Sequence, residues 1–282
     1  MKTSLLHRLG ALVAGLLGLA GAAAAAPADT YTISVVPQFT AVEIDHDWTP
    51  VLERLSRETG YRFKLEVSES IPKFETSVLA GGPDFAYLNP YHEVMARRAQ
   101  GYIPLVRGSK PLQGILVVRK DAAIRSVADL DGQSIAFPAP NAFGASLWMR
   151  ALLTERYKLH FTPTYVRTHS NCYLHVATGR TAACGGIART LTEQEPEVRD
   201  VLRVLFQTPG VPPHPLAAHP RVPPAVRERV TQALLGMARD APGQALLRGI
   251  EMNQPVLADY ARDYAPLEQF GLEKYVVHPP PQ

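Results

Sequence analysis

The sequence GGPDFAYLNPYHEV, residues 81–94, contains the end of one helix, a short strand and the start of another helix. Gly81 and Gly82 end a helix expected over 74–80, because glycine rarely continues a helix. The run 84–88 is apolar after Asp84, which is typical of a buried strand. Asn89 is a helix-capping residue type and Pro90 suits the first turn of the helix that follows. A strand that is preceded and followed by helices in the sequence is typical of α/β folds.

The same alternation extends in both directions along the chain. We expect further strands over residues 31–36, 62–67, 114–119, 135–137, 164–167, 181–185 and 201–207. We expect further helices over residues 48–59, 145–153, 173–178, 225–239 and 242–249. Strands separated by helices indicate βαβ units and a mostly parallel sheet. The proline-rich segment 208–224 is expected to be irregular.

This pattern predicts an α/β fold of two lobes with a hinge between them. The chain would cross between the lobes at 114–119 and again near 207–211. The first lobe would contain residues 29–115 and 209–282, and the second lobe residues 116–208. The two C-terminal helices would thus return to the first lobe.

The N-terminus has the pattern of a secretory signal peptide. Lys2, His7 and Arg8 precede an apolar, alanine- and leucine-rich run over 9–26, and small residues up to Ala28 suit a cleavage site. A retained membrane anchor is the alternative, but the run is weakly hydrophobic. There is no cysteine near the cleavage site, so we do not expect a lipid to be attached there. We therefore expect an exported periplasmic protein that is cleaved near Ala28.

Composition narrows the class of function. Removing residues 1–28 takes away Lys2 and Arg8 and no acidic residue, so the formal charge falls from +3 to +1. A nearly neutral chain argues against nucleic-acid binding. The patterns G-x-S-x-G and H-E-x-x-H and the phosphate-binding loop are not found, so we do not expect an enzyme. No cofactor and no metal site are expected.

In open α/β sheets a ligand lies at the carboxyl ends of the strands, beside the starts of the following helices. Two lobes that contribute such ends to one cleft can enclose a small molecule. The candidate ligand-binding residues at these positions are Gln38, Phe39, Asn89, Tyr91, Asn141, Ala142, Phe143, Gly144, His169 and Ser170. Each has a structural alternative: helix capping for Asn89 and His169, and packing for Phe39 and Tyr91.

The stretch FPAPNAFGAS, residues 137–146, joins a strand to a helix. Such a junction can bind an anion, because unpaired backbone N–H groups and the positive end of the helix converge there. Before the helix, however, the stretch offers no hydroxyl, lysine or arginine, and only Asn141 is polar.

We expect structural roles for several other polar and aromatic residues. Trp48 falls on an amphipathic helix and is expected in the core, and Glu93 is expected at the surface. His214 and His219 stand between prolines and are expected in a solvated or structural loop. These two histidines show no metal-binding spacing, and the same holds for His46, His92, His160 and His175.

Cys172 and Cys184 are the only cysteines, an even number that suits an oxidising compartment. A disulfide, two free thiols and a thiol-based ligand site are all compatible with this count. Between them lie a helix of about eight residues, a turn at Gly179 and a strand of about five residues. The helix is about 12 Å long and the strand about 16 Å long, and the turn makes the strand run back along the helix. The two cysteines should lie close together, which favours a disulfide that braces this loop.

Several segments together resemble a known family. They are SVVPQF (34–39), GGPDFAYLNPYHEV (81–94), LVVRKDAAIRSVADLDGQSIAFPAP (116–140) and HPRVPPAVRERV (219–230). The mature chain is similar to periplasmic solute-binding proteins of the phosphate, phosphite and phosphonate type, which serve ABC transporters. This resemblance implies the type II periplasmic binding protein fold, in agreement with the two lobes expected above.

The resemblance also implies where the ligand would bind. Phosphonate binders of this family place Ser-Thr-Ser-Gly where this chain has Asn141, Ala142, Phe143 and Gly144, so only the glycine is shared. A His-Asp pair becomes His169-Ser170, and an acidic residue becomes Ala182. Each lost hydrogen bond to a charged group costs about 1.5–3 kcal/mol. We therefore expect a divergent member that binds a small polar or anionic ligand other than a simple phosphonate.

The resemblance implies delivery of that ligand to an ABC transporter permease by a monomeric binding protein. The alternative is a ligand sensor that docks on the periplasmic domain of a sensor histidine kinase. If Cys172 and Cys184 were reduced, they would form with His169 a soft site for a thiophilic oxyanion such as arsenite.

Overall fold

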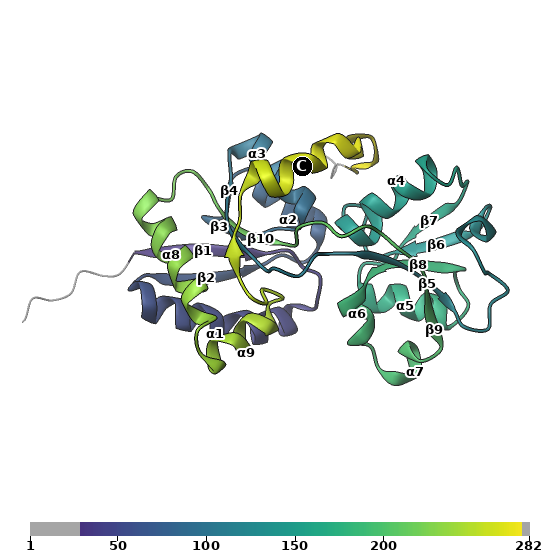
Figure 1. Ribbon diagram of the computed structural model, residues 1–282, viewed down its shortest axis with the longest axis horizontal. Coiled ribbons are helices and arrows are strands. Elements are labelled where there is room, and N and C mark those ends of the chain that lie inside the picture. The colour runs from purple at the N-terminus through teal and green to yellow at the C-terminus, as the bar shows by residue number, and fades with distance from the viewer. Residues whose placement is uncertain (1–28, 278–282) are drawn as a thin grey trace, which may run out of the picture.

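The computed structural model describes residues 29–277. The expected signal peptide, residues 1–28, lies outside this part of the chain. Two α/β lobes lie side by side along the long axis of the molecule, each with helices on both faces of its sheet (Figure 1). The two-lobed α/β fold expected from the sequence is confirmed.

The first lobe is built on a six-stranded sheet with the strand order β11-β4-β10-β3-β1-β2. β1 is parallel to β2 and β3, whereas β10 and β11 run antiparallel to their neighbours. The strands are β1 (Thr30–Val35), β2 (Arg62–Val67), β3 (Phe85–Tyr87), β4 (Ile103–Arg107), β10 (Pro215–Ala218) and β11 (Val256–Leu257).

The helices of the first lobe are α1 (Ala41–Thr59), α2 (Ile71–Leu79), α3 (Pro90–Gln100), α8 (Pro224–Met237) and α9 (Ala241–Gly249). The expected start of α1 near residue 48 is wrong. The helix begins at Ala41, because Thr40 and Glu43 bond each other's backbone N–H groups in a capping box. Pro50 lies inside this helix and obscured the pattern in the sequence.

The second lobe is built on a five-stranded sheet with the order β7-β6-β8-β5-β9. Its strands are β5 (Gly114–Arg119), β6 (Ser134–Phe137), β7 (Thr162–Tyr165), β8 (Ala183–Ile187) and β9 (Leu202–Gln207). Its helical segments are the 3-10 turn η1 (Val127–Leu130), the π-helical turn η2 (Phe143–Leu147), α4 (Trp148–Glu155), α5 (His169–Ala177), α6 (Ala188–Thr192) and α7 (Pro196–Arg199).

Two expectations about the sheets are wrong. Both sheets are mixed rather than mostly parallel, since β5 is antiparallel to β8 and β9, and β10 is antiparallel to β3 and β4. The segment expected to be irregular contains β10, a buried strand in the middle of its sheet. β5 and β10 each follow a crossing between the lobes, so no helical crossover has to make them parallel.

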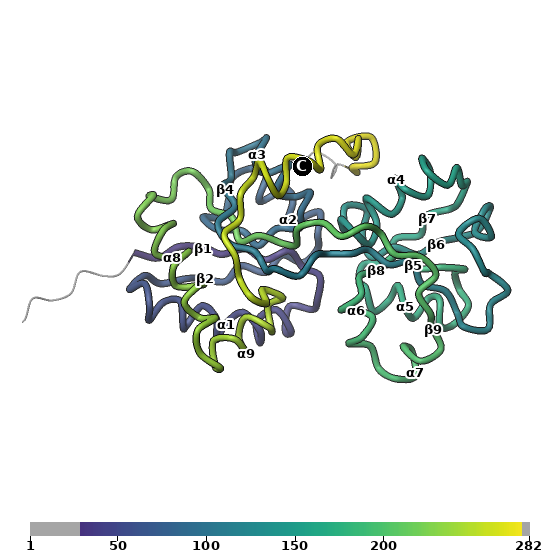
Figure 2. Tube along the Cα trace, viewed as in Figure 1, coloured from purple at the N-terminus to yellow at the C-terminus, as the bar shows by residue number. Residues whose placement is uncertain are grey.

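Two chain segments cross between the lobes, one from β4 to β5 and one from β9 to β10 (Figure 2). They contact each other through a bridge between Leu112 and Val211, with N···O distances of 2.8 and 3.1 Å. The two crossings are therefore paired into a short ribbon.

The C-terminal segment also reaches the second lobe. It forms the short turns η3 (Tyr260–Tyr264), η4 (Ala265–Phe270) and η5 (Leu272–Tyr275). Lys274 and the hydroxyl of Tyr275 both bond Glu155 of α4. A hydrophobic cluster joins this segment to both lobes, with Tyr91 of α3 stacked on Phe143 at 6.5 Å.

Cys172 in α5 and Cys184 in β8 form a disulfide with a Cα–Cα distance of 5.6 Å. This is the pairing that the sequence favoured. Both cysteines are fully buried and belong to the core beneath α5. Within residues 29–277, none of the helices has the length and apolar character needed to cross a membrane.

Candidate functional site

A pocket lies between the two lobes beside the crossing ribbon, and we call it the interlobe pocket. It is nearly closed in this structure, with a cavity volume of about 10 Å³, which is room for about one water molecule. Its walls come from both lobes and from the ribbon. The lining residues are Gln38, Asn89, Leu112, Ala142, Phe143, Gly144, Ala145, His169, Ile187 and His214.

The first lobe contributes three polar side chains to this pocket. Gln38 follows β1, and its amide N–H donates to Nε2 of His214, 3.0 Å away. Asn89 caps α3 by accepting from the backbone N–H of His92 at 2.7 Å. Its side-chain N–H groups face the carbonyl of Asn141 at 3.2 Å and Nε2 of His92 at 3.2 Å. These side chains are thus held in place by neighbours before any ligand binds.

The second lobe contributes the turn η2, which rests directly on two strands. A Cβ atom on Gly114 of β5 would clash with the carbonyl of Gly144, and one on Gly185 of β8 would clash with that of Ala145. Only glycine allows the turn to approach so closely. The first N–H groups of a helical turn have no partner within the helix, and the first residues of η2, Phe143, Gly144 and Ala145, line the pocket.

His169 begins α5 and His214 precedes β10, and both side chains are 2–3% exposed. Nδ1 of His169 lies 3.3 Å from the hydroxyl of Thr190, and its Nε2 has no partner among the described residues. Because Gln38 donates to Nε2 of His214, the neutral ring carries its proton on Nδ1, which also lacks a partner there.

Both histidines are held in the neutral form. Burial lowers the pKa of His169 to about 4. Burial, followed by the positive charges that His92 and His169 can carry, lowers the pKa of His214 to about 3. None of the ten lining residues is Lys, Arg, Asp or Glu. At neutral pH the walls therefore offer uncharged donors and acceptors together with the apolar surface of Phe143, Leu112 and Ile187.

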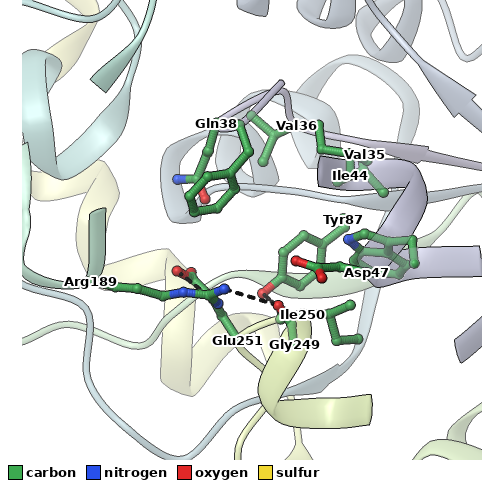
Figure 3. A pocket seen from close by; sticks show the side chains of 12 residues that line it. Val35, Val36, Gln38, Ile44, Asp47, Tyr87, Arg189, Gly249, Ile250 and Glu251 are labelled. Carbon is green, nitrogen blue, oxygen red and sulfur yellow. Dashed lines mark hydrogen bonds and ion pairs between the residues drawn. The ribbon is translucent and has the colours of Figure 1, made fainter. Parts of the chain in front are cut away.

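A second cavity, with a volume of about 20 Å³, shares Gln38 with this pocket and is also lined by Phe39. Here Arg189 of α6 reaches across from the opposite lobe toward Glu251 and Gly249 (Figure 3). Its guanidinium donates to the carbonyl of Gly249 at 3.1 Å and lies 3.2 Å from the Glu251 carboxylate. It also lies over the ring of Phe39 at 5.3 Å. Arg189 thus binds one lobe to the other.

The structure brings six of the ten predicted ligand-binding residues to the interlobe pocket: Gln38, Asn89, Ala142, Phe143, Gly144 and His169. The other four lie elsewhere. Phe39 lines the cavity next to Arg189, and Tyr91 packs against Phe143 in the interlobe cluster. The Asn141 amide donates to Glu75 at 2.9 Å and to the carbonyl of Val277 at 2.8 Å, and Ser170 is exposed.

One of the expectations about other residues is wrong, and another needs to be narrowed. His214 lies in a loop, as expected, but the loop is structural rather than solvated, because His214 is buried in the pocket directly ahead of β10. The signal that could have identified His214 is its position directly before a central strand, but the sequence pattern did not reveal that strand. Glu93 is fully buried rather than at the surface, because the C-terminal segment packs over its helix. Trp48 is buried, as expected.

Among residues 29–277, no group of three or more His, Cys, Asp or Glu side chains is arranged to hold a metal ion. The sulfur atoms of Cys172 and Cys184 are consumed in their disulfide. The pair therefore offers no thiolate to His169 in this structure.

Two α/β lobes, a paired crossing ribbon and a pocket lined by both lobes define a two-lobed solute-binding protein. Similar solved structures share this fold. The binding protein component of an ABC phosphonate transporter from Pseudomonas aeruginosa matches with a TM-score of 0.76 and 14% identity, over 86% of this chain and 85% of that one. PhnD1 from Prochlorococcus marinus in complex with methylphosphonate matches with a TM-score of 0.78 and 14% identity, over 86% and 97%.

A more distant match is the GluR0 ligand-binding core from Nostoc punctiforme in complex with L-glutamate, with a TM-score of 0.58 and 15% identity, over 78% of this chain and 99% of that one. No curated protein matches the sequence. The family described as "ABC transporter, phosphonate, periplasmic substrate-binding protein" matches residues 33–264. The chain belongs to this family, whose members bind substrates for transport and are not enzymes.

Proposed function

We propose that the protein captures a small oxyanion in the interlobe pocket and delivers it to the membrane permease of an ABC transporter. The mature chain would begin after a cleavage near Ala28. Residues 29–115 with 209–282 and residues 116–208 would move as two bodies about the crossing ribbon. We also predict that the protein is a monomer. The alternative to delivery to a permease is docking on a sensor kinase.

The observation that carries this proposal is the set of hydrogen-bonding groups that surround the pocket. Gln38, Asn89 and His214 belong to one lobe, whereas His169 and the N–H groups of η2 belong to the other. A ligand that bonds both sets at once would hold the lobes together. Ligand-driven closure of two lobes follows from such divided contacts.

The side chains at η2 bear on the choice of oxyanion. Ala142 and Phe143 offer no hydroxyl, so backbone N–H groups and the two histidines must supply the hydrogen bonds. PhnD1 holds methylphosphonate, and we expect this chain to bind that compound more weakly than a smaller or less charged oxyanion. Absence of a fixed cation on the pocket wall favours a monoanion over a dianion.

Isothermal titration calorimetry with phosphite, phosphate, methylphosphonate, acetate and methanesulfonate tests the proposal. His169→Ala should weaken the best of these ligands about tenfold or more, since a hydrogen bond to a charged group is worth about 1.5–3 kcal/mol. The matched control is Ser170→Ala, because Ser170 is the next residue and is exposed. Binding that is equally weakened by both substitutions, or absent across the whole panel, would refute the proposal.

A further inference from the structure

The interlobe pocket is lined by two imidazole rings, and each ring has one buried nitrogen that lacks a hydrogen-bond partner among the described residues. Nε2 of His169 and Nδ1 of His214 both lack a hydrogen-bond partner among the described residues. Both side chains are more than nine-tenths buried and line the pocket from opposite lobes. Buried polar atoms without partners are uncommon in folded proteins. Their placement in the pocket points to a bound group that forms a hydrogen bond with the unpartnered nitrogen of each ring.

The buried ionisable groups around the two rings do not supply a free positive charge. The groups that pack around them, or line the adjoining cavity with His214, are Glu75, Tyr87, His92, Lys110, Tyr173, Arg189, Glu251 and Tyr264. His92 is bonded to Glu75 at 2.7 Å, and Arg189 is paired with Glu251 at 3.2 Å. Lys110 is exposed, and burial raises the pKa of each tyrosine, so all three stay neutral.

An oxyanion buried in this pocket therefore lacks a compensating charge as long as both rings are neutral. Transfer of an uncompensated charge out of water is expensive, and a nearby anion raises the pKa of an imidazole. We propose that the protein binds its oxyanion together with one proton, which the His169–His214 pair takes up from solvent. This inference rests on the proposed function and adds its proton stoichiometry.

The hydrogen bonds behind the rings suit such a proton. A protonated His169 can donate from Nδ1 to the hydroxyl of Thr190, which is itself bonded to the carbonyl of Ile187 at 3.0 Å. Its Nε2–H then points to the ligand. A protonated His214 would have to donate from Nε2, where the Gln38 amide now donates, so Gln38 would need to turn its oxygen toward the ring. His169 is therefore the better proton acceptor of the pair.

Calorimetry in two buffers with different enthalpies of ionisation measures the proton uptake directly. The probe is methanesulfonate or acetate, whichever binds, because neither changes its own charge between pH 6 and 8. We expect uptake of close to one proton per ligand at pH 6 and an affinity that rises up to about tenfold for each unit that the pH falls. Binding with no proton uptake and no pH dependence would overturn the inference but leave the proposed function intact. An absence of binding at every pH contradicts the proposed function itself.

Single substitutions assign the proton. His169→Gln keeps a polar side chain but cannot be protonated, so it should abolish the proton uptake, and His214→Gln should reduce it less. His160→Gln is the matched control, because His160 is exposed in the same lobe as His169. Should either pocket variant fail to bind, nitrogen-15 NMR of the histidine rings in the wild-type complex gives the answer. A neutral His169 and a neutral His214 in the bound protein would refute the inference.

Discussion

Glu93 carries a carboxyl group that the fold buries without a hydrogen-bond partner. It lies in the first turn of α3, fully buried, and both of its carboxylate oxygens are unpartnered among the described residues. Burial raises the pKa of Glu93 well above its ordinary value, and the nearby positive charge of Arg97 only partly opposes this. The side chain therefore holds its proton in the folded protein under conditions where it is ionised in the unfolded chain.

We predict that Glu93→Gln stabilises the protein at pH 8, because glutamine is neutral without taking up a proton, whereas the buried carboxyl of Glu93 must take one up on folding. The gain should be about 1.4 kcal/mol for each pH unit between the pKa of the unfolded chain and the lower of pH 8 and the folded-state pKa. The carboxyl group of Glu93 has a higher pKa in the folded protein than in the unfolded chain, where the pKa is near 4.5. Its contribution to the stability of the wild type is therefore fully present below pH 4.5. This contribution is lost as the pH rises through the pKa that Glu93 has in the folded protein. The Glu93→Gln variant should not lose stability in this way. The free energies of unfolding of the two proteins should therefore be similar near pH 4 and differ at pH 8.

Urea unfolding at several pH values checks this prediction. Glu197→Gln is the matched control, since Glu197 is exposed in the first turn of α7. A variant as sensitive to pH as the wild type would show that Glu93 is not the group responsible.

At this scale the sequence predicted much of the pocket lining, because strand ends and helix starts can be recognised from capping residues and glycines. It could not predict which side chains turn toward the pocket. Tyr91 and Asn141 stand beside lining residues but are occupied by Phe143 and Glu75, which come from the other lobe. Such contacts depend on how the lobes meet, and no local pattern contains that information.

At the scale of single elements, the close seat of η2 on β5 and β8 determines the shape of the pocket. We predict that Gly185→Ala lowers the stability by about 1–3 kcal/mol, the usual cost of overpacking a core. Its new methyl group would also push η2 toward the pocket and weaken ligand binding about tenfold or more.

Thermal unfolding and calorimetry test this substitution. The matched control is Gly236→Ala in α8, where an added Cβ meets nothing within 4 Å. This control should leave binding unchanged and leave stability unchanged or slightly higher, since alanine favours helix. Normal stability and binding in the Gly185 variant would contradict the proposed role of the close contact.

The disulfide belongs to the same scale, since it ties α5, which begins with His169, to β8. We predict that Cys172→Ser with Cys184→Ser lowers the free energy of unfolding by about 3 kcal/mol, the value for closing a loop of about 13 residues. A thiol assay on the denatured, unreduced wild type should find no free thiol. Two reactive thiols, or an unchanged stability, would contradict the bridge.

Most helices and strands could be predicted from periodicity, glycines and capping residues. The failures have physical causes. β10 has only four residues and stands among prolines, so no alternation is visible, yet tertiary pairing with β3 and β4 makes it a central strand. The direction of β5 and β10 follows from the crossings between lobes, which a repeating βαβ pattern does not reveal.

At the scale of the whole molecule, side-chain contacts hold the two lobes together in two places. Asn141 donates to Glu75, and Arg189 donates to the carbonyl of Gly249 and forms an ion pair with Glu251. A binding protein must break such contacts to admit or release its ligand. Their strength therefore sets the balance between open and closed forms.

We predict that Arg189→Ala weakens the closed form by about 1.5–3 kcal/mol, the value of a hydrogen bond to a charged group. Small-angle X-ray scattering of the ligand-free protein should show a larger radius of gyration for this variant than for the wild type. Arg199→Ala removes an arginine from the same lobe whose partner, Asp200, is its neighbour in sequence, and should leave the scattering unchanged. Identical curves for the Arg189 variant and the wild type would show that this contact does not hold the lobes.

The central claim is that an oxyanion binds between His169 and His214, and its location can be seen directly. Crystals grown with methylarsonate, the arsenic analogue of methylphosphonate, would be measured at the arsenic absorption edge. We predict one strong anomalous peak within hydrogen-bonding reach of both rings and of the N–H groups of η2. A peak beside Arg189 instead, or none between the lobes at saturating methylarsonate, would contradict the account.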